Sequence, residues 1–333
     1  MKANNLTCSD QVDPSVHMFF MVAHSLVFLV GLFLNGFTLK VYFCQAQQLA
    51  YRSMTVYLKN LAVADFLISL CLPMRIANYA SSSISIRQIY CNFGASAFYL
   101  NMYASILFMG FIAANRYLKI IHPAGTHVLQ TVQAARNIAI ATWGFLLAIM
   151  STYIILSLVS QDVLPSVPKA VSCDVLHSKQ LNSYYKTIHA CTAAIFLFVL
   201  VSLVSFYYNI SRRLSQAQQR QLASSSSKKL ARSRRNMLVL VIVFCICFVP
   251  YHLIRLPYMF MRSRCSWNHV FLYMKELTVT MSILNVCLDP LIYFIFCKAF
   301  RTQLNLRRAL SATRVATHGD DAERRSSKTL SVL

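Results

Sequence analysis

Charged and aromatic side chains interrupt a part of the sequence that is otherwise apolar. The run MLVLVIVFCICFVP continues into YHLIRLPY, which places His252 and Arg255 three residues apart, with Tyr258 close behind. Residues three or four apart share one face of a helix. An imidazole and a guanidinium on one face suit phosphate or carboxylate, because Arg presents a planar fork of hydrogen-bond donors.

Similar residues stand near the ends of other apolar segments and would complete a cup of positive charge and aromatic rings. Lys275 and Glu276 are neighbours, and we expect neighbours in a helix to point apart. The predicted members of the cup are Arg75, Tyr99, Tyr103, Lys186, His189, His252, Arg255, Tyr258, Lys275 and Glu276. Such a cup favours a small anionic ligand. The alternative for each cation is that only its stem is buried while its head reaches the lipid headgroups.

A second set of polar residues falls near the middle of the apolar segments. Carboxylates at such positions need oxygens, water or a cation around them. One interpretation is a shared polar cavity, and the other is a set of separate groups that each pack one helix against another. The set comprises Asn35, Asp65, Ser105, Asn285 and Asp289.

The elements that must position these residues are membrane-spanning helices. Hydrophobic residues make up 57% of the 333 residues and charged residues only 13%, about half the charged share of a soluble domain. A bilayer core of about 30 Å needs roughly 20 apolar residues in a helix. We therefore predict an all-α membrane protein, a seven-transmembrane helix bundle spanning 17–297, with helices near 17–44, 54–80, 88–120, 134–158, 184–211, 235–261 and 269–297.

Basic residues predict the orientation of the bundle. Segment 209–236 carries eight Lys and Arg residues and no acid, and positive loops resist translocation. We therefore expect this segment in the cytoplasm and residues 1–16 outside a plasma membrane. Residues 298–310 are predicted to form an amphipathic helix on the inner leaflet, in contact with membrane lipid, and residues 311–333 a disordered cytoplasmic tail. The net charge of +22 then reflects topology and does not indicate nucleic-acid binding.

Cysteines on the predicted outer side indicate disulfide bonds. Of the eleven cysteines, only Cys8, Cys91, Cys173 and Cys265 fall on that side, which suggests two disulfides and leaves three pairings open. Asn5 begins a glycosylation sequon on the same side.

One motif in each span gives the sequence its resemblance to a family. Along nearly its whole length the chain resembles the rhodopsin-like (class A) G protein-coupled receptors, through GLFLNG, LAVAD, NRY, CFVP and DPLIY among others. The resemblance implies a pairing of Cys91 with Cys173 and a sodium site at Asp65, Ser105, Asn285 and Asp289. It also implies coupling to a heterotrimeric G protein, by an outward swing of the sixth helix near Pro250. The switch residues it implies are Asn115, Arg116, Tyr117, Tyr207, Phe248, Pro250 and Tyr293.

Longer segments narrow the resemblance. FYLNMYASI, CFVPYHLIRLPY and YMKELTVTMSILNVCLDPLIYFIFCKAF are similar to the purinergic branch, which includes receptors for ADP and UDP-sugars. This implies a nucleotide or nucleotide-sugar agonist, a second disulfide between Cys8 and Cys265, and inhibitory G proteins. Receptors for lysophosphatidylserine and platelet-activating factor are similar too, so a phospholipid mediator is the alternative agonist. Phosphorylation of the tail is expected to recruit arrestin.

Some observations restrict the function further. Asn115 stands where the family usually has Asp, so we expect raised basal signalling. The chain shows no internal repeat of the kind that transporters usually carry, which makes a transporter a remote alternative. It also lacks HExxH, GxSxG and phosphate-loop motifs. We therefore expect no enzyme activity, and no cofactor other than the sodium ion.

Overall fold

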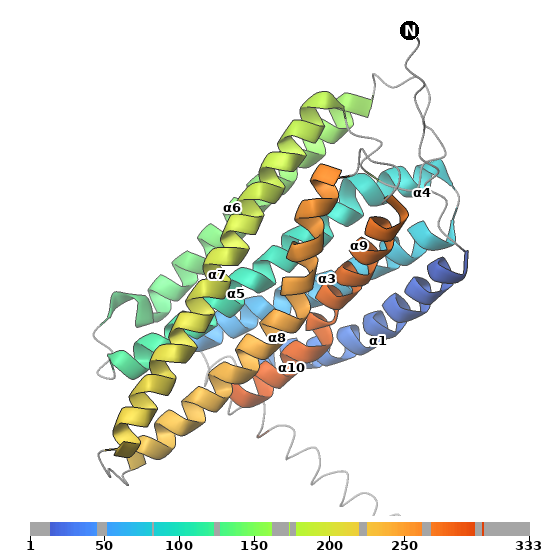
Figure 1. Cartoon of the computed structure of the whole chain (residues 1–333). Helices are drawn as coiled ribbons and strands as arrows, with labels where there is room; N and C mark the ends of the chain where they lie inside the picture. The colour runs from blue at the N-terminus through green and yellow to red at the C-terminus, as the bar shows by residue number, and fades with distance from the viewer. Residues whose placement is uncertain are drawn as a thin grey trace, which may run out of the picture.

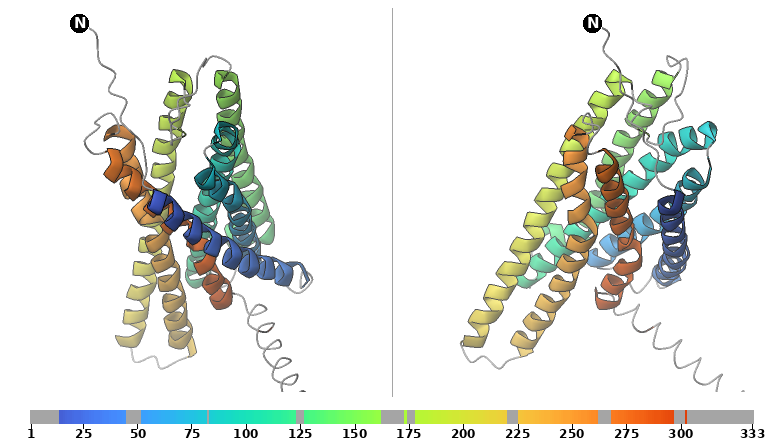
Figure 2. Two further views of the ribbon diagram at one scale, coloured as in Figure 1. Left: turned by 90° about the vertical axis from the view of Figure 1, so that its right-hand side faces the viewer. Right: turned by 45° about the vertical axis from the view of Figure 1, so that its right-hand side comes forward.

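The chain folds as a bundle of long helices. The computed structural model describes residues 14–44, 52–81, 83–122, 127–161, 173, 178–219, 225–261, 268–296 and 302. Within these residues, seven helices are long and apolar enough to cross a membrane, and they lie side by side (Figures 1 and 2). The predicted fold class is confirmed. The predictions for Asn5, Cys8 and Cys265 lie outside the described residues, as do those for 298–310, apart from residue 302, and for the tail 311–333.

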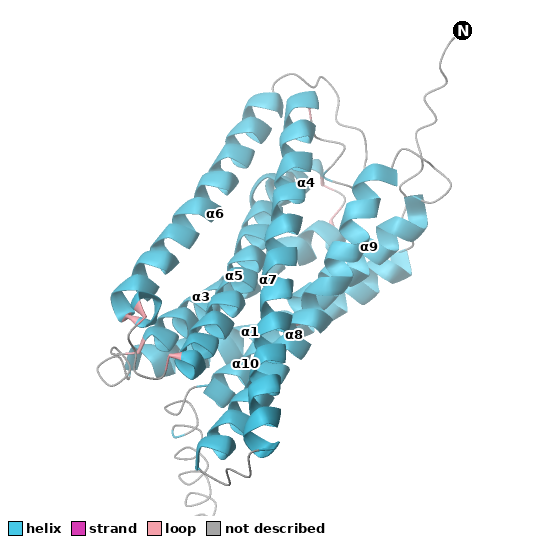
Figure 3. Cartoon of the chain, turned by 60° about the vertical axis from the view of Figure 1, so that its left-hand side comes forward, coloured by secondary structure: helices cyan, strands magenta, loops and turns pink. Residues whose placement is uncertain are grey.

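Helix covers almost all of the described chain, and the few described residues outside helices form short loop pieces (Figure 3). The third span is assembled from a short helix, a π-helical turn and a long helix, and the seventh is interrupted at Leu284. In chain order the elements are α1 (Pro14–Cys44), α3 (Ser53–Ala80), α4 (Ile84–Ile89), η1 (Tyr90–Gly94), α5 (Ala95–Ile121), η2 (Val128–Gln130), α6 (Val132–Gln161), α7 (Lys179–Gln219), α8 (Ser225–Met261), α9 (Asn268–Ile283) and α10 (Asn285–Phe296).

The fifth and sixth spans are longer than predicted. α7 continues to Gln219 and α8 already begins at Ser225, so both pass the predicted ends at 211 and 235. Apart from five serines, the additional residues are Lys, Arg, Gln, Leu and Ala, and they include neither Pro nor Gly, which lets a helix propagate in water. We call this the basic end of the bundle. The opposite end carries the Cys91–Cys173 disulfide, and we call it the disulfide end.

α8 remains one helix through two prolines. Pro250 and Pro257 both lie inside it, although a proline removes one backbone donor and crowds the preceding turn. Near Pro250, the Cys247 carbonyl accepts a hydrogen bond from Ser282 Oγ of α9 at 3.0 Å. α8 is therefore tied to α9 at its proline turn, two residues before the seventh span breaks at Leu284.

α1 and α10 pack closely at Gly31. A Cβ atom on Gly31 would overlap the side chain of Val286 and lie 2.8 Å from Ser69 Oγ, so the approach requires glycine. One turn along α1, Asn35 Nδ2 donates to the Gly31 carbonyl at 3.1 Å and to the Val286 carbonyl at 2.8 Å. Asn35 thus joins α1 to α10. This agrees with the interpretation in which the polar residue packs one helix against another.

α5 runs through the interior of the bundle. In the most apolar stretch of the third span, Ile84–Ile121, 67% of the residues are buried, against 17% in the fourth, Val132–Val159. Residues on α5 can therefore meet side chains from most other spans. The disulfide fixes the start of this span, because Cys91 lies in η1 directly before α5.

Candidate functional site

A cavity of about 390 Å³ lies at the disulfide end, between residues of α1, α3, α4, α5, α6, α7, α8 and α9. Most of the cup predicted from the sequence is brought together there. The predicted residues that line the cavity are Arg75, Tyr99, Tyr103, His189, Arg255, Lys275 and Glu276.

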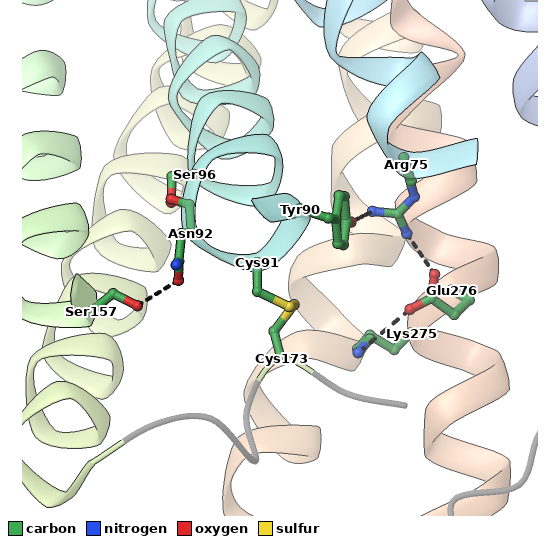
Figure 4. The surroundings of a disulfide bond; sticks show 9 residues. All are labelled: Arg75, Tyr90, Cys91, Asn92, Ser96, Ser157, Cys173, Lys275 and Glu276. Carbon is green, nitrogen blue, oxygen red and sulfur yellow. Dashed lines mark hydrogen bonds and ion pairs between the residues drawn. A yellow bond between two sulfur atoms is a disulfide. The ribbon is translucent and has the colours of Figure 1, made fainter. Parts of the chain in front are cut away.

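Arg75 is held by a network of hydrogen bonds inside the bundle. It donates to Tyr90 Oη at 2.7 Å, to Tyr79 Oη at 3.1 Å and to Glu276 Oε2 at 2.5 Å, and Tyr79 Oη also donates to Glu276. Figure 4 shows the guanidinium between Tyr90 and Glu276, close to the disulfide. The Arg75 side chain is only 7% exposed. The alternative in which it reaches lipid headgroups is therefore wrong for this residue.

Lys275 and Glu276 do not point apart, contrary to the expectation for helix neighbours. Lys275 Nζ lies 3.5 Å from Glu276 Oε1, and it also lies 5.0 Å from the ring centroid of Tyr258. The long side chain of Lys275 reaches the Glu276 carboxylate, which Arg75 also contacts. Glu276 therefore bridges two cations that come from α3 and α9.

Aromatic rings surround Arg255. Its guanidinium carbon lies 5.9 Å, 5.3 Å and 5.5 Å from the ring centroids of Tyr99, Tyr185 and Tyr258. It also donates to His189 Nε2 at 3.4 Å. Cation–π contacts of this kind stabilise a charge away from water. They hold the guanidinium at the cavity wall without neutralising its charge.

Three predicted members of the cup do not line the cavity. Lys186 is exposed on the surface of α7, because the rotation of this helix directs His189 inward and turns Lys186 away. Tyr258 lies behind Arg255 and Lys275, with its ring against both cations. His252 lies deeper than either.

His252 connects the cavity to the interior of α8. Its Nε2 lies 3.4 Å from Tyr103 Oη, which belongs to the cavity wall. Its Nδ1 lies 2.8 Å from the Phe248 carbonyl, and its ring stacks on Phe196 with centroids 3.8 Å apart. His252 is therefore a link between Tyr103 and the segment before Pro250.

The sequence interpretation missed several residues of the site. Tyr79, Tyr90, Arg87 and His17 line the cavity, and the two tyrosines hold Arg75. Only Tyr79 carried a usable signal, because it follows Arg75 by four residues and so shares its helix face. Tyr90 and Arg87 stand just before α5, where no regular apolar pattern indicates which way a side chain points.

The predicted polar core is partly one network. Asp65 Oδ1 accepts from Ser105 Oγ at 3.1 Å and from Asn285 Nδ2 at 3.3 Å, and Asp65 Oδ2 accepts from Tyr293 Oη at 2.6 Å. Asp289 is fully buried close to Asp65, and neither of its carboxylate oxygens accepts a hydrogen bond from an N–H or O–H donor among the described residues. The core joins α3, α5 and α10, while Asn35 lies outside it.

Four of the predicted switch residues, Asn115, Arg116, Tyr117 and Tyr207, lie toward the basic end, whereas Phe248 and Pro250 lie beside His252 in α8 and Tyr293 belongs to the polar core. Asn115 Nδ2 donates to Ser53 Oγ of α3 at 3.0 Å, and the Arg116 guanidinium carbon lies 4.7 Å from the ring centroid of Phe296 on α10. The switch residues Tyr117 and Tyr207 are half-buried on α5 and α7. Tyr117 stacks on Phe206, with centroids 4.6 Å apart.

Seven apolar helices with a ligand-sized cavity at one end and a polar core beneath it define the class of seven-span membrane receptors. Residues 8–293 match the family described as 7 transmembrane receptor (rhodopsin family). The chain belongs to this family, and it is a multi-pass membrane receptor and not an enzyme.

Curated relatives place the chain within the family. It is 34% identical to purinoceptor 14 of Bos taurus, over 90% of this chain and 86% of that protein. It is 32% identical to G-protein coupled receptor 87 of Mus musculus, over 85% and 78% of the two chains. It is also 32% identical to Probable G-protein coupled receptor 34 of Mus musculus, over 86% and 76%. The chain is therefore close to the purinergic branch, as the sequence predicted.

Proposed function

We propose that this chain is a plasma-membrane receptor for a small anionic agonist, in the first place a nucleotide or nucleotide sugar. The disulfide end with its cavity faces the outside of the cell, as does the N-terminus. The basic end faces the cytoplasm and couples to heterotrimeric G proteins of the inhibitory type. The relatives that are named purinoceptors support this choice of agonist.

Convergence of cations on one cavity is the observation that carries the proposal. Arg75, Arg87, Arg255 and Lys275 all line it, and Glu276 is the only acid among its described lining residues. Because Glu276 offsets only part of this charge, an anionic group in the cavity is favoured. Tyrosines along the same wall suit the flat ring of a base or the face of a sugar.

Removal of single cations tests the proposal. In cells that report inhibition of cyclic AMP, Arg255→Ala and Lys275→Ala are expected to abolish the response to ADP or UDP-sugars at unchanged surface expression. Lys186→Ala is the matched control, because Lys186 is a lysine near the same end that is exposed and does not line the cavity. A response that survives both cavity substitutions contradicts a phosphate-binding role for these cations.

A second candidate agonist, a lysophospholipid, is favoured by one wall of the cavity. Leu100 of α5, Leu146, Ile149 and Met150 of α6, and Ile188 of α7 line it with apolar side chains. An acyl chain would bury its methylenes against this wall at about 0.8 kcal/mol each. Ile149→Trp is therefore expected to reduce a response to lysophosphatidylserine and to spare a response to nucleotides. The opposite pattern would exclude the apolar wall as an acyl site.

The polar core fits a sodium ion, and we include this ion in the proposal. The buried Asp289 oxygens accept from no N–H or O–H donor among the described residues, and Asp65 and Ser105 supply further oxygen ligands nearby. When bound, the ion would offset the two buried carboxylates. Replacing potassium by sodium is expected to lower agonist affinity in membranes, and Asp65→Asn to remove that difference. Equal affinities in the two salts would contradict the site.

A further inference from the structure

Arg116 lies under an aromatic ring from another helix. Its guanidinium carbon is 4.7 Å from the ring centroid of Phe296, the last residue of α10. Phe296 is itself half-buried and packs against the core of the bundle. The ring is therefore held against the core, and a cation over it is stabilised, more strongly away from water than at an exposed site.

The residue before Arg116 supplies no charge to it. Asn115 is a neutral amide, 2% exposed, and its Nδ2 is turned toward Ser53 of α3. In this chain a carboxylate can meet a cation on the adjacent residue, as Glu276 meets Lys275. At position 115 the side chain contributes to packing between α3 and α5 instead of restraining the arginine.

Phe296 is connected to the polar core through α10, which also carries Tyr293. It follows Tyr293 by three residues on α10, so the two side chains share one helix face. Tyr293 donates to Asp65 Oδ2 at 2.6 Å and packs edge-on against Tyr42 of α1. A movement of α10 that takes Tyr293 away from Asp65 would also move Phe296 relative to Arg116.

We infer that Phe296 is a positioning residue that holds Arg116 in the non-signalling arrangement. In this chain the ring of Phe296 contributes part of the restraint that a carboxylate at position 115 would add to. The inference rests on the proposed coupling to G proteins, and it adds the means by which that coupling is kept low. Because α10 carries both Phe296 and Tyr293, a change in the polar core reaches Arg116 through a single helix.

The test compares three variants of the full receptor in lipid nanodiscs. Phe296→Leu keeps an apolar side chain but removes the ring, Phe296→Tyr keeps the ring, and Phe294→Leu is the matched control. Phe294 lies on the same helix but is 44% exposed, on a different face from Phe296. Phe296→Met replaces Phe296→Leu if that variant accumulates poorly.

The first readout needs neither ligand nor G protein. It is the distance between labels at His122 of the basic end and Arg232 of α8, introduced as bio-orthogonal amino acids because Cys191 is exposed. Phe296→Leu is expected to shift the population toward longer distances, while Phe296→Tyr and Phe294→Leu match the unsubstituted receptor. Equal distributions for Phe296→Leu and the unsubstituted receptor overturn the inference. A shift with Phe296→Tyr or Phe294→Leu as large as that with Phe296→Leu overturns it as well.

The second readout is nucleotide exchange on an added G protein without agonist. Phe296→Leu is expected to raise it about two- to fivefold, the factor that corresponds to one lost cation–π contact. If no variant and not even the unsubstituted receptor raises nucleotide exchange on the G protein, the proposed coupling is contradicted. If the label distances nevertheless shift with Phe296→Leu, the role of Phe296 remains supported. Flat exchange with Phe296→Leu alone, in a receptor that otherwise couples, overturns the inference.

Discussion

Arg75 and Glu276 form an ion pair that is almost removed from water, with side chains 7% and 18% exposed. Such a pair recovers its desolvation cost only when its remaining donors and acceptors are also satisfied. Here Tyr79 and Tyr90 provide those partners. The pair therefore fixes α3 against α9, and it also shapes the cavity wall between them.

Breaking one side of this pair is expected to destabilise the receptor. Glu276→Gln leaves the Arg75 charge buried without its carboxylate, and removal of one partner from a buried pair costs about 3–5 kcal/mol. Thermal unfolding of the purified receptor without ligand should show a clearly lower midpoint.

The matched control replaces both partners. Arg75→Met with Glu276→Leu keeps similar volumes and removes the buried guanidinium together with its carboxylate, which leaves only Lys275 without that partner. Its midpoint is therefore expected to lie well above that of Glu276→Gln. If the double variant is as unstable as Glu276→Gln, packing and not the unpaired charge explains the loss.

Asn115→Asp is expected to lower signalling without agonist. A carboxylate at this position adds an anion beside Arg116, in the way that Glu276 lies beside Lys275, and the added attraction favours the restrained arginine. Basal nucleotide exchange, normalised to surface expression, measures the effect. An unchanged basal rate would show that the neutral amide does not raise signalling.

Charge within an apolar run was enough to predict Arg75, Arg255 and Lys275 at the cavity. It could not separate them from Lys186, because the direction of a side chain depends on how its helix is rotated against its neighbours. The Arg75–Glu276 pair joins residues 201 positions apart. Only the folded bundle brings them together, so residue spacing could not reveal the pair.

Close packing between α1, α3 and α10 depends on one missing side chain. Gly31→Ala places a methyl group against Val286 and Ser69, and the helices must separate to accept it. We expect a lower unfolding midpoint, although alanine favours helix by about 0.8–1 kcal/mol over glycine.

Gly144→Ala is the control for this prediction. Apart from the nearby backbone of α6 itself, no atom lies within 4 Å of the position that a Cβ would take on Gly144, so the helix preference acts alone and the midpoint should stay or rise. A rise for Gly31→Ala as well would mean that the helices adjust without strain.

Helix boundaries show where sequence interpretation succeeds and where it stops. Where a helix ends together with its apolar sequence, the prediction is right to within a few residues, as with α3, which spans Ser53–Ala80 against a predicted 54–80. The apolar run does not predict the C-terminal end of α7 or the start of α8, because both helices continue into polar sequence. The break at Leu284 was missed for a related reason, since the apolar pattern continues through it.

The distribution of charge over the whole molecule predicts its orientation. The basic end carries a cluster of Lys and Arg around the connection between α7 and α8, and such loops remain on the cytoplasmic side. An epitope tag before Met1 is therefore expected to be accessible on intact cells, and a tag after Leu333 only after permeabilisation. Staining in the reverse order would invert the proposed topology.

The long part of α8 that precedes Pro250 amplifies any tilt of the helix at that proline. From Pro250 back to Ser225 the helix extends about 38 Å, at a rise of about 1.5 Å per residue. A tilt of about 10° at the proline would carry its far tip through roughly 6–7 Å, given that rise. Displacements too small to disturb the buried packing around His252 would thus become, at the far tip, a shift of more than half a helix diameter of about 10–12 Å, which enlarges the space open to a helix of another protein.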